Sequence, residues 1–148
     1  MSAVILLDTG TLGVLTNPNR NPHLRAIRRW LIDLQNAGRR IILPEITDYE
    51  LRRELIRNGS QKALANLDQL HLQIEYLALT TPVMRLAAEL WANARNAGQQ
   101  TAHDHALDGD VILAAQAQSL GVPVVVATDN PAHLSRFVPS DSWQNITP

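Results

Sequence analysis

The chain contains no cysteine among its 148 residues. Disulfide bonds, zinc knuckles, iron–sulfur clusters and a thiol nucleophile are therefore excluded. Long hydrophobic runs are also missing, because no stretch approaches the roughly 20 apolar residues that span a membrane. The apolar start at residues 3–7 is too short for a signal peptide and lacks its basic segment. We expect a soluble cytoplasmic protein that does not contact a membrane.

Lysine is nearly absent, since Lys62 is the only one among 13 basic residues and the rest are arginines. This disfavours any reaction that needs a catalytic lysine elsewhere in the chain. The formal net charge of −1 predicts no general affinity for nucleic acid. The charge is nevertheless segregated, at +4 over residues 20–57 and −4 over residues 100–148. A basic region beside an acidic one requires an explanation.

The hydrophobic pattern predicts strands that alternate with helices. Continuous apolar runs are typical of strands buried on both faces, and they lie at residues 3–7, 40–43, 123–127 and, more weakly, 74–79. Segments of helical period cover residues 24–34, 46–57, 61–72, 83–97 and 107–120. We expect a short edge strand near residues 143–146. The alternation predicts one α/β domain over residues 1–148, a three-layer α/β/α sandwich with a mostly parallel central sheet.

Four acidic residues are predicted to meet at one edge of this sheet. In a parallel sheet, ligands bind at the carboxyl ends of the strands, where the crossover helices also begin. Asp8 directly follows the first strand, and Asp129 follows the strand at residues 123–127. Glu50 lies in the early turns of the helix after the second strand, and Asp110 lies near the start of the last long helix. We therefore expect all four carboxylates to converge.

Four carboxylates in one crevice repel one another, so a cation is needed to keep them ionised. Oxygen ligands in a chain without cysteine and with few histidines favour Mg²⁺ or Mn²⁺. Such an ion binds phosphates and activates water, which is the basis of metal-assisted phosphodiester hydrolysis. Guanidinium groups can hold a nucleic-acid backbone. The arginines expected to contact phosphate are Arg25, Arg28, Arg29 and Arg53.

Four motifs resemble those of the PIN domain nucleases, and in particular the VapC-like toxins of bacterial toxin–antitoxin pairs. In chain order, they are ILLDT at residues 5–9, ITDYEL at 46–51, DVILAA at 110–115 and VVATDNPAHLSRF at 125–137. Together they span nearly the whole chain, at separations similar to those of the family. The resemblance implies an acidic quartet with polar support, which is Asp8, Glu50, Asp110 and Asp129 with Thr9, Thr128 and Asn130.

The same resemblance implies a function. It indicates a ribonuclease that uses Mg²⁺ or Mn²⁺ to activate water for attack on an RNA phosphodiester, leaving a 5′-phosphate and a 3′-hydroxyl. It also implies a homodimer and, for the VapC branch, an antitoxin protein whose tail fills the groove.

Some assignments within the quartet stay open. Asp129 can be a direct metal ligand, a water-mediated one or a partner of Asn130. We favour Glu50 because residues 49–51 fit the family spacing, and Asp110 because it opens the DVILAA motif. The acids that compete with these two are Glu45, Glu54, Asp104 and Asp108.

Three other interpretations compete with a ribonuclease. The Asp8-Thr9-Gly10 run matches the aspartic-protease signature, but that fold is almost entirely β, whereas this chain is mostly of helical period. A magnesium-dependent phosphatase or a receiver domain needs a lysine after a late strand, and Lys62 lies too early. A PIN-like module could bind RNA or a protein without cleavage, although an intact acidic quartet would repel phosphates.

Other conspicuous side chains have simpler predicted roles. The HDH run at residues 103–105 is expected to be polar loop, because three consecutive residues rarely converge on one ion. His133 is expected to lie on the surface beside the groove. The tryptophans are expected to anchor the core or a dimer interface rather than to stack on bases, and they are Trp30, Trp91 and Trp143.

Overall fold

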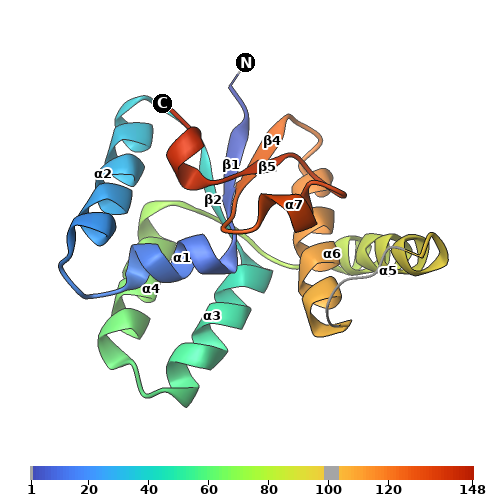
Figure 1. Ribbon diagram of the computed structural model, residues 1–148, viewed down its shortest axis with the longest axis horizontal. Coiled ribbons are helices and arrows are strands. Elements are labelled where there is room, and N and C mark those ends of the chain that lie inside the picture. The colour runs from blue at the N-terminus through green and yellow to red at the C-terminus, as the bar shows by residue number, and fades with distance from the viewer. Residues whose placement is uncertain (1, 99–103) are drawn as a thin grey trace.

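Five parallel strands form the centre of the computed structural model, which describes residues 2–98 and 104–148, except for the side chains of 104–106 (Figure 1). The strands are β1 (Val4–Leu7), β2 (Ile41–Pro44), β3 (Glu75–Leu77), β4 (Val124–Ala127) and β5 (Ser140–Asp141). Their order is β3-β2-β1-β4-β5, and every neighbouring pair is parallel. The predicted parallel sheet is confirmed, and the strand expected at residues 74–79 is shorter than predicted.

Helices connect the strands. They are α1 (Thr9–Thr16), α2 (Pro22–Asn36), α3 (Glu45–Arg57), α4 (Gln61–Gln73), α5 (Thr81–Asn96), α6 (Asp104–Ser119) and α7 (Pro131–Leu134). Five of them match predicted segments. The sequence pattern missed α1 and α7 because both are short, and because α1 is rich in glycine and threonine and has no clear apolar stripe.

The sheet is buried on both faces, which explains the continuous apolar runs in its strands. All four residues of β1 are buried, and alternate side chains join different hydrophobic clusters. Ile5 and Leu7 pack in a cluster with residues of α1, α2 and α4, whereas Val4 and Leu6 pack in one with residues of α6. The helices therefore form a layer on each side of the sheet, as the predicted three-layer sandwich requires.

The short edge strand predicted in the tail from residue 139 is present, but its predicted position at residues 143–146 is wrong. The edge strand is β5, which hydrogen-bonds to β4 through the Pro139 carbonyl and the Asp141 carbonyl. Residues Trp143–Asn145 instead form a 3-10 turn, and the Asp141 carboxylate accepts hydrogen bonds from the Ser142 N–H and the Asn145 amide. The turn allows the Trp143 ring to enter the core, where burial of the indole outweighs continued strand pairing.

Two of the three tryptophans belong to the core, as predicted. The rings of Trp30 and Trp143 lie 5.7 Å apart, and the Trp30 indole N–H donates to the Ile146 carbonyl at 2.7 Å. Trp91 differs, because 37% of it is exposed on α5. Within the described part of the chain, we find no helix that is long and apolar enough to cross a membrane.

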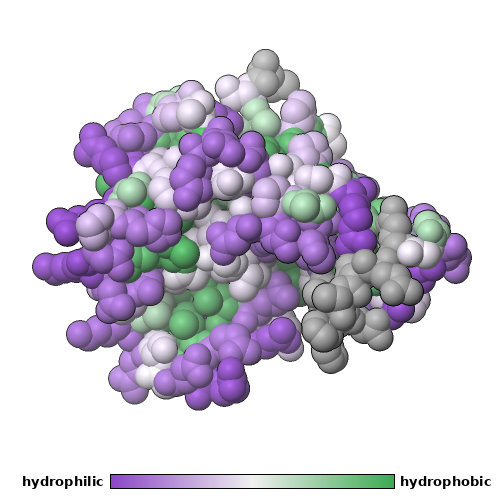
Figure 2. Space-filling view, viewed as in Figure 1, coloured by the Kyte–Doolittle hydropathy of each residue, from purple (hydrophilic) through white to green (hydrophobic). Residues whose placement is uncertain are grey.

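The carboxyl end of β1 is the meeting point of several helices. Only Asp8 separates β1 from α1, and β2 passes directly into α3. Figure 1 shows α1, α3, α6 and α7 around this end of the sheet. Figure 2 shows the same side of the molecule as largely hydrophilic, with hydrophobic surface gathered between α1, α3 and α4.

Candidate metal and active site

Asp8 lies in the turn between β1 and α1. Its N–H donates to the Ala127 carbonyl at 3.0 Å, which ties this turn to the end of β4. Carboxylate Oδ1 accepts from the Thr9 N–H at 2.7 Å, and Oδ2 accepts from the Thr128 hydroxyl at 2.6 Å. Burial raises the pKa of Asp8 above its ordinary value, even though both hydrogen bonds oppose the shift, and the charge of Asp129 adds to it.

Glu50 extends from α3 to the same turn. Its Oε1 accepts a hydrogen bond from the Thr9 hydroxyl at 2.8 Å, across 41 positions of sequence. Its Oε2 lies against α6, where a Cβ built on Gly109 would be only 2.6 Å away. Burial raises the pKa of Glu50, the Thr9 bond and Arg53 oppose this, and Asp8 reinforces it. Glu50 and Asp8 thus share one hydrogen-bonding partner residue, Thr9.

Asp110 lies on α6 in the field of both preceding acids. Its pKa is raised to about 6, first because burial removes water and then because Asp8 is nearby. His133 and Arg136 lower this pKa, and Glu50 raises it by a smaller amount. The Arg136 guanidinium lies 4.9 Å from the Phe137 ring and has one buried nitrogen without a hydrogen-bond partner among the described residues.

Asp129 follows β4 and is exposed. Its carboxylate lies over the first turn of α1, because a Cβ built on Gly10 would overlap Oδ2 and lie 3.0 Å from Cγ. The next N–H, of Asn130, donates to the Thr128 hydroxyl oxygen at 3.1 Å. Since the same hydroxyl donates to Asp8, Thr128 links this loop to the strand-end aspartate.

The structure therefore brings the four predicted acids to one edge of the sheet. They come from four separate segments: the β1–α1 turn, α3, α6 and the β4–α7 turn. Three of them have raised pKa values, so each is less ready to ionise here than in water. Burial and mutual repulsion are the causes, and both are relieved by a bound cation.

The donor set fits a hard divalent cation in its chemistry. All four side chains offer carboxylate oxygen, the donor that Mg²⁺ and Mn²⁺ prefer, and the chain offers no thiolate. Gly10 lies against the Asp129 carboxylate and Gly109 against the Glu50 carboxylate, and a side chain at either glycine would occupy the space that the carboxylate takes. Among the side chains that the structure describes, no three acids or histidines are close enough together to ligate a single ion.

A family model of the PIN domain matches residues 5–135. The chain belongs to the PIN domain family. The match includes all four acids of the site, and the resemblance stated from the four motifs is confirmed. No curated protein matches the sequence.

Solved structures share this PIN fold at low sequence identity. VapBC2 from Rickettsia felis, bound to a DNA fragment from its promoter, matches with 15% identity and a TM-score of 0.71, covering 95% of this chain and 98% of that one. DNA-bound VapBC from Salmonella typhimurium matches with 22% identity and a TM-score of 0.66, covering 96% and 99%. VapC20 from Mycobacterium tuberculosis, described as a sarcin-ricin loop cleaving toxin, matches with 18% identity and a TM-score of 0.62, covering 90% and 96%.

The competing acids of this PIN domain have other contacts. Glu45 Oε1 accepts from the Leu79 N–H at 2.7 Å, which ties the start of α3 to the end of β3. Glu54 pairs with Arg57 at 2.7 Å on the surface. Asp108 is exposed and lines a pocket between α5 and α6. Asp104 and His105 lie in the first turn of α6 and not in the loop expected for the HDH run, whereas their side chains and residue 103 lie outside the described part of the chain.

The predicted phosphate-binding arginines are distributed over two helices. On α2, Arg25 is exposed, Arg28 donates to the carbonyls of Asn17 and Asn19, and Arg29 pairs with Asp33. Figure 1 places α2 and α6 on opposite sides of the molecule, so the structure does not bring these three to the acids. On α3, the exposed Arg53 lies 5.1 Å from the ring of Tyr49 and acts electrostatically on Glu50.

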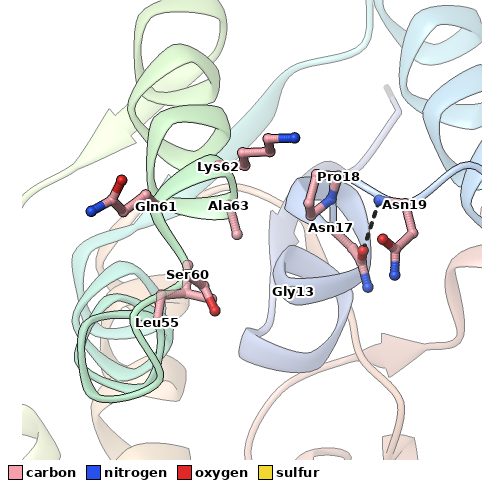
Figure 3. A pocket seen from close by; sticks show the side chains of 9 residues that line it. All are labelled: Gly13, Asn17, Pro18, Asn19, Leu55, Ser60, Gln61, Lys62 and Ala63. Carbon is pink, nitrogen blue, oxygen red and sulfur yellow. Dashed lines mark hydrogen bonds between the residues drawn. The ribbon is translucent and has the colours of Figure 1, made fainter.

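An open pocket lies between the later part of α1, the end of α3 and the start of α4 (Figure 3). Its volume is about 440 Å³, and Gly13, Leu55 and Lys62 are among the residues that line it. None of the four acids does. The loop that closes one side is held by the Asn19 N–H, which donates to the Asn17 side chain at 3.0 Å. This cavity is therefore separate from the carboxylate site.

Sequence reasoning missed three residues that touch or influence the carboxylates: Gly10, Gly109 and Arg136. A glycine inside a helix costs about 1 kcal/mol relative to alanine, so the DGD run at residues 108–110 was a detectable signal of close packing. Arg136 is the only arginine or lysine in the acidic segment at residues 100–148, which was also visible in the sequence. His133 was expected only as a surface residue, and it acts electrostatically on Asp110.

Proposed function

We propose that the protein is an endoribonuclease that hydrolyses RNA phosphodiester bonds with Mg²⁺ or Mn²⁺. One observation carries the proposal: four carboxylates from separate segments of a PIN domain lie at one sheet edge, and three of them have raised pKa values. A fold does not need this arrangement, because desolvated like charges destabilise it. A site that binds a cation for phosphodiester chemistry explains why it is retained.

The roles of the residues follow from their contacts. Asp8, Glu50, Asp110 and Asp129 would hold the cation, which when bound supplies a polarised phosphoryl oxygen and an activated water. Thr9 orients Glu50 through its hydroxyl, and Thr128 orients Asp8 in the same way. Asn130 contributes through its backbone N–H to Thr128.

The RNA-binding residues that we propose are Arg25, Arg28, Arg29 and Arg53. Arg53 is the strongest of the four, because it is exposed on the same helix as Glu50 and close enough to lower the pKa of that carboxylate. Its guanidinium can meet a phosphate next to the acidic site. The α2 arginines would contact RNA only where the strand extends over that side of the molecule.

We also propose that the protein is the toxin of a toxin–antitoxin pair, inhibited by an antitoxin protein, and that it forms a homodimer. The VapBC complexes and the sarcin-ricin loop cleaving VapC20 among the similar structures support the first part. Co-expression with the product of the adjacent reading frame, followed by co-purification, tests for the antitoxin. Light scattering of the purified protein tests for the dimer.

The decisive experiment compares RNA cleavage by the wild type and Asp8→Asn in the presence of Mn²⁺. Asparagine keeps the shape and the hydrogen bond to the Thr9 N–H but removes the negative charge, so we expect cleavage to fall by at least about 100-fold. Asp68→Asn is the matched control, because Asp68 is an exposed acid on α4 that pairs with Arg52, which is not among the proposed RNA-binding arginines. Equal cleavage by wild type and Asp8→Asn contradicts the proposal. RNA binding by the wild type without cleavage would support the non-cleaving module.

A further inference from the structure

We propose that Gly10 and Gly109 are positioning residues of the carboxylate site, where the missing side chains allow Asp129 and Glu50 to lie against helices α1 and α6. The inference rests on the proposed function, because it concerns the same four acids. Both glycines lie within helices, where alanine would be favoured by propensity alone. The presence of glycine at these two positions therefore calls for a local reason.

The contact at Gly109 involves a carboxylate that is held on two sides. A methyl carbon at this position would lie 2.6 Å from Glu50 Oε2, closer than non-bonded atoms pack, and 3.3 Å from Cδ, which is a tight contact. The other oxygen, Oε1, accepts the Thr9 hydroxyl bond at 2.8 Å. Displacement of Oε2 would turn the whole carboxylate and so break or distort its bond to Thr9.

The contact at Gly10 is similar but less constrained. A methyl carbon there would overlap Asp129 Oδ2 and lie 3.0 Å from Cγ. Asp129 is exposed, so its side chain can rotate away at little cost to the fold. In both cases the atom in the way is the end of a flexible side chain and not backbone. The substitution should therefore move a carboxylate while leaving the helices intact.

Gly13 provides a matched control on the same helix as Gly10. A methyl carbon at Gly13 would meet only the Leu51 Cδ1 atom at 3.6 Å, an ordinary van der Waals contact. Gly13 lines the pocket of Figure 3, which none of the four acids lines. Gly13→Ala thus makes the same chemical change in the same type of structure without touching a carboxylate.

The experiment measures Mn²⁺ binding to the metal-free protein by calorimetry, together with thermal unfolding. We expect Gly109→Ala to weaken Mn²⁺ binding by roughly tenfold or more, with a smaller loss for Gly10→Ala and none for Gly13→Ala. Gly109→Ala should also raise the Tm by about 3 °C, because alanine is the better helix former. Weaker binding in a more stable protein distinguishes positioning from damage to the fold.

A double variant shows whether Gly109 acts through Glu50. In the Glu50→Ala background the carboxylate is gone, so adding Gly109→Ala should leave the remaining Mn²⁺ affinity unchanged. The inference is overturned if Gly109→Ala and Gly10→Ala bind Mn²⁺ as tightly as the wild type. It is equally overturned if Gly109→Ala causes the same loss with and without Glu50.

A metal-independent measurement separates this inference from the proposed function. Carboxyl ¹³C NMR of the metal-free protein should show a changed Glu50 resonance in Gly109→Ala and a changed Asp129 resonance in Gly10→Ala, with neither changed in Gly13→Ala. Unchanged resonances overturn the positioning role. If the resonances move but the wild type binds no Mn²⁺, the proposed function fails and the positioning of the carboxylates stands.

Discussion

At the scale of the residue, Asp110 shows that burying acids close together destabilises their ionised form. Its pKa of about 6 compares with 3.8 for an ordinary aspartate, and burial is the largest cause. The ionised form is therefore less stable in the folded chain than in the unfolded one. The neutral Asp110 carboxyl is therefore more compatible with the folded state than the ionised one. Its contribution to the free energy of unfolding is fully present below pH 3.8, is lost as the pH rises through about 6, and stays lost at neutral pH.

We predict that Asp110→Asn stabilises the metal-free protein at pH 8, by about 1–2 kcal/mol after allowance for solvent screening. The gain should shrink as the pH falls through 6 and vanish below 4, because the wild-type carboxyl is then neutral in both states. Urea unfolding with a chelator present, repeated across this pH range, measures the difference.

Asp108→Asn is the control for that experiment. Asp108 lies on the same helix, carries the same charge and is exposed, so its replacement should change the free energy of unfolding by less than about 0.5 kcal/mol at any pH. A pH-independent effect of Asp110→Asn, or an equal effect of Asp108→Asn, would contradict the assigned cause.

At the scale of the element, α3 carries two kinds of acid. Glu50 reaches the carboxylate site, whereas Asp48 is buried and holds the helix against its neighbours. Asp48 accepts a hydrogen bond from the Tyr76 hydroxyl at 3.0 Å and pairs with Arg52 at 2.9 Å. Burial, followed by the charge of Asp48, raises the pKa of Tyr76, so the phenol stays a donor.

We predict that Asp48→Ala lowers the free energy of unfolding by about 1–3 kcal/mol, because it removes a buried acceptor from two half-buried donors, the Tyr76 hydroxyl and Arg52 Nε. Asp68→Ala removes the other carboxylate that pairs with Arg52, but 64% of the Asp68 side chain is exposed, compared with 8% for Asp48. It should therefore cost less than about 1 kcal/mol. Denaturant unfolding of both variants tests this, and equal losses would contradict it.

At the scale of the whole molecule, both of the oppositely charged segments contribute residues to the carboxylate site. The acidic segment supplies Asp110 and Asp129 to the site, and the charges of its His133 and Arg136 act on Asp110. The basic segment supplies α2 and α3, and so both Glu50 and Arg53. A net charge near zero is thus the sum of one segment with an excess of arginine and one with an excess of aspartate.

We predict that Arg53→Gln weakens RNA binding and reduces the slope of log K against log[salt] by roughly 0.7–1, as expected for one lost phosphate contact. Arg57→Gln on the same helix is the control, since Arg57 pairs with Glu54 and should leave the slope unchanged. Binding of uncleaved RNA to Asp8→Asn at several salt concentrations provides the measurement. An unchanged slope for Arg53→Gln would remove it from the RNA contacts.

Much of this architecture could be predicted from the sequence because it depends on local patterns. Apolar runs such as residues 3–7 become buried parallel strands, and an acid directly after such a strand must lie at the carboxyl edge of the sheet. The short helix α1 could not be predicted in this way, since it begins at the cap provided by Asp8 and gains its stability from packing. The edge strand was misplaced because the burial of Trp143 depends on the distant Trp30.

The sequence by itself determined the fold class, the PIN motifs and the four acids that gather at one sheet edge. Only the tertiary structure decided how these acids are held. Thr9 bonds to Glu50 across 41 positions, and glycines on α1 and α6 leave space for two carboxylates. Such contacts are set by atoms from separate elements. No local pattern specifies them, because the effect of a hydroxyl or of a missing methyl group depends on which atoms from other elements lie next to it.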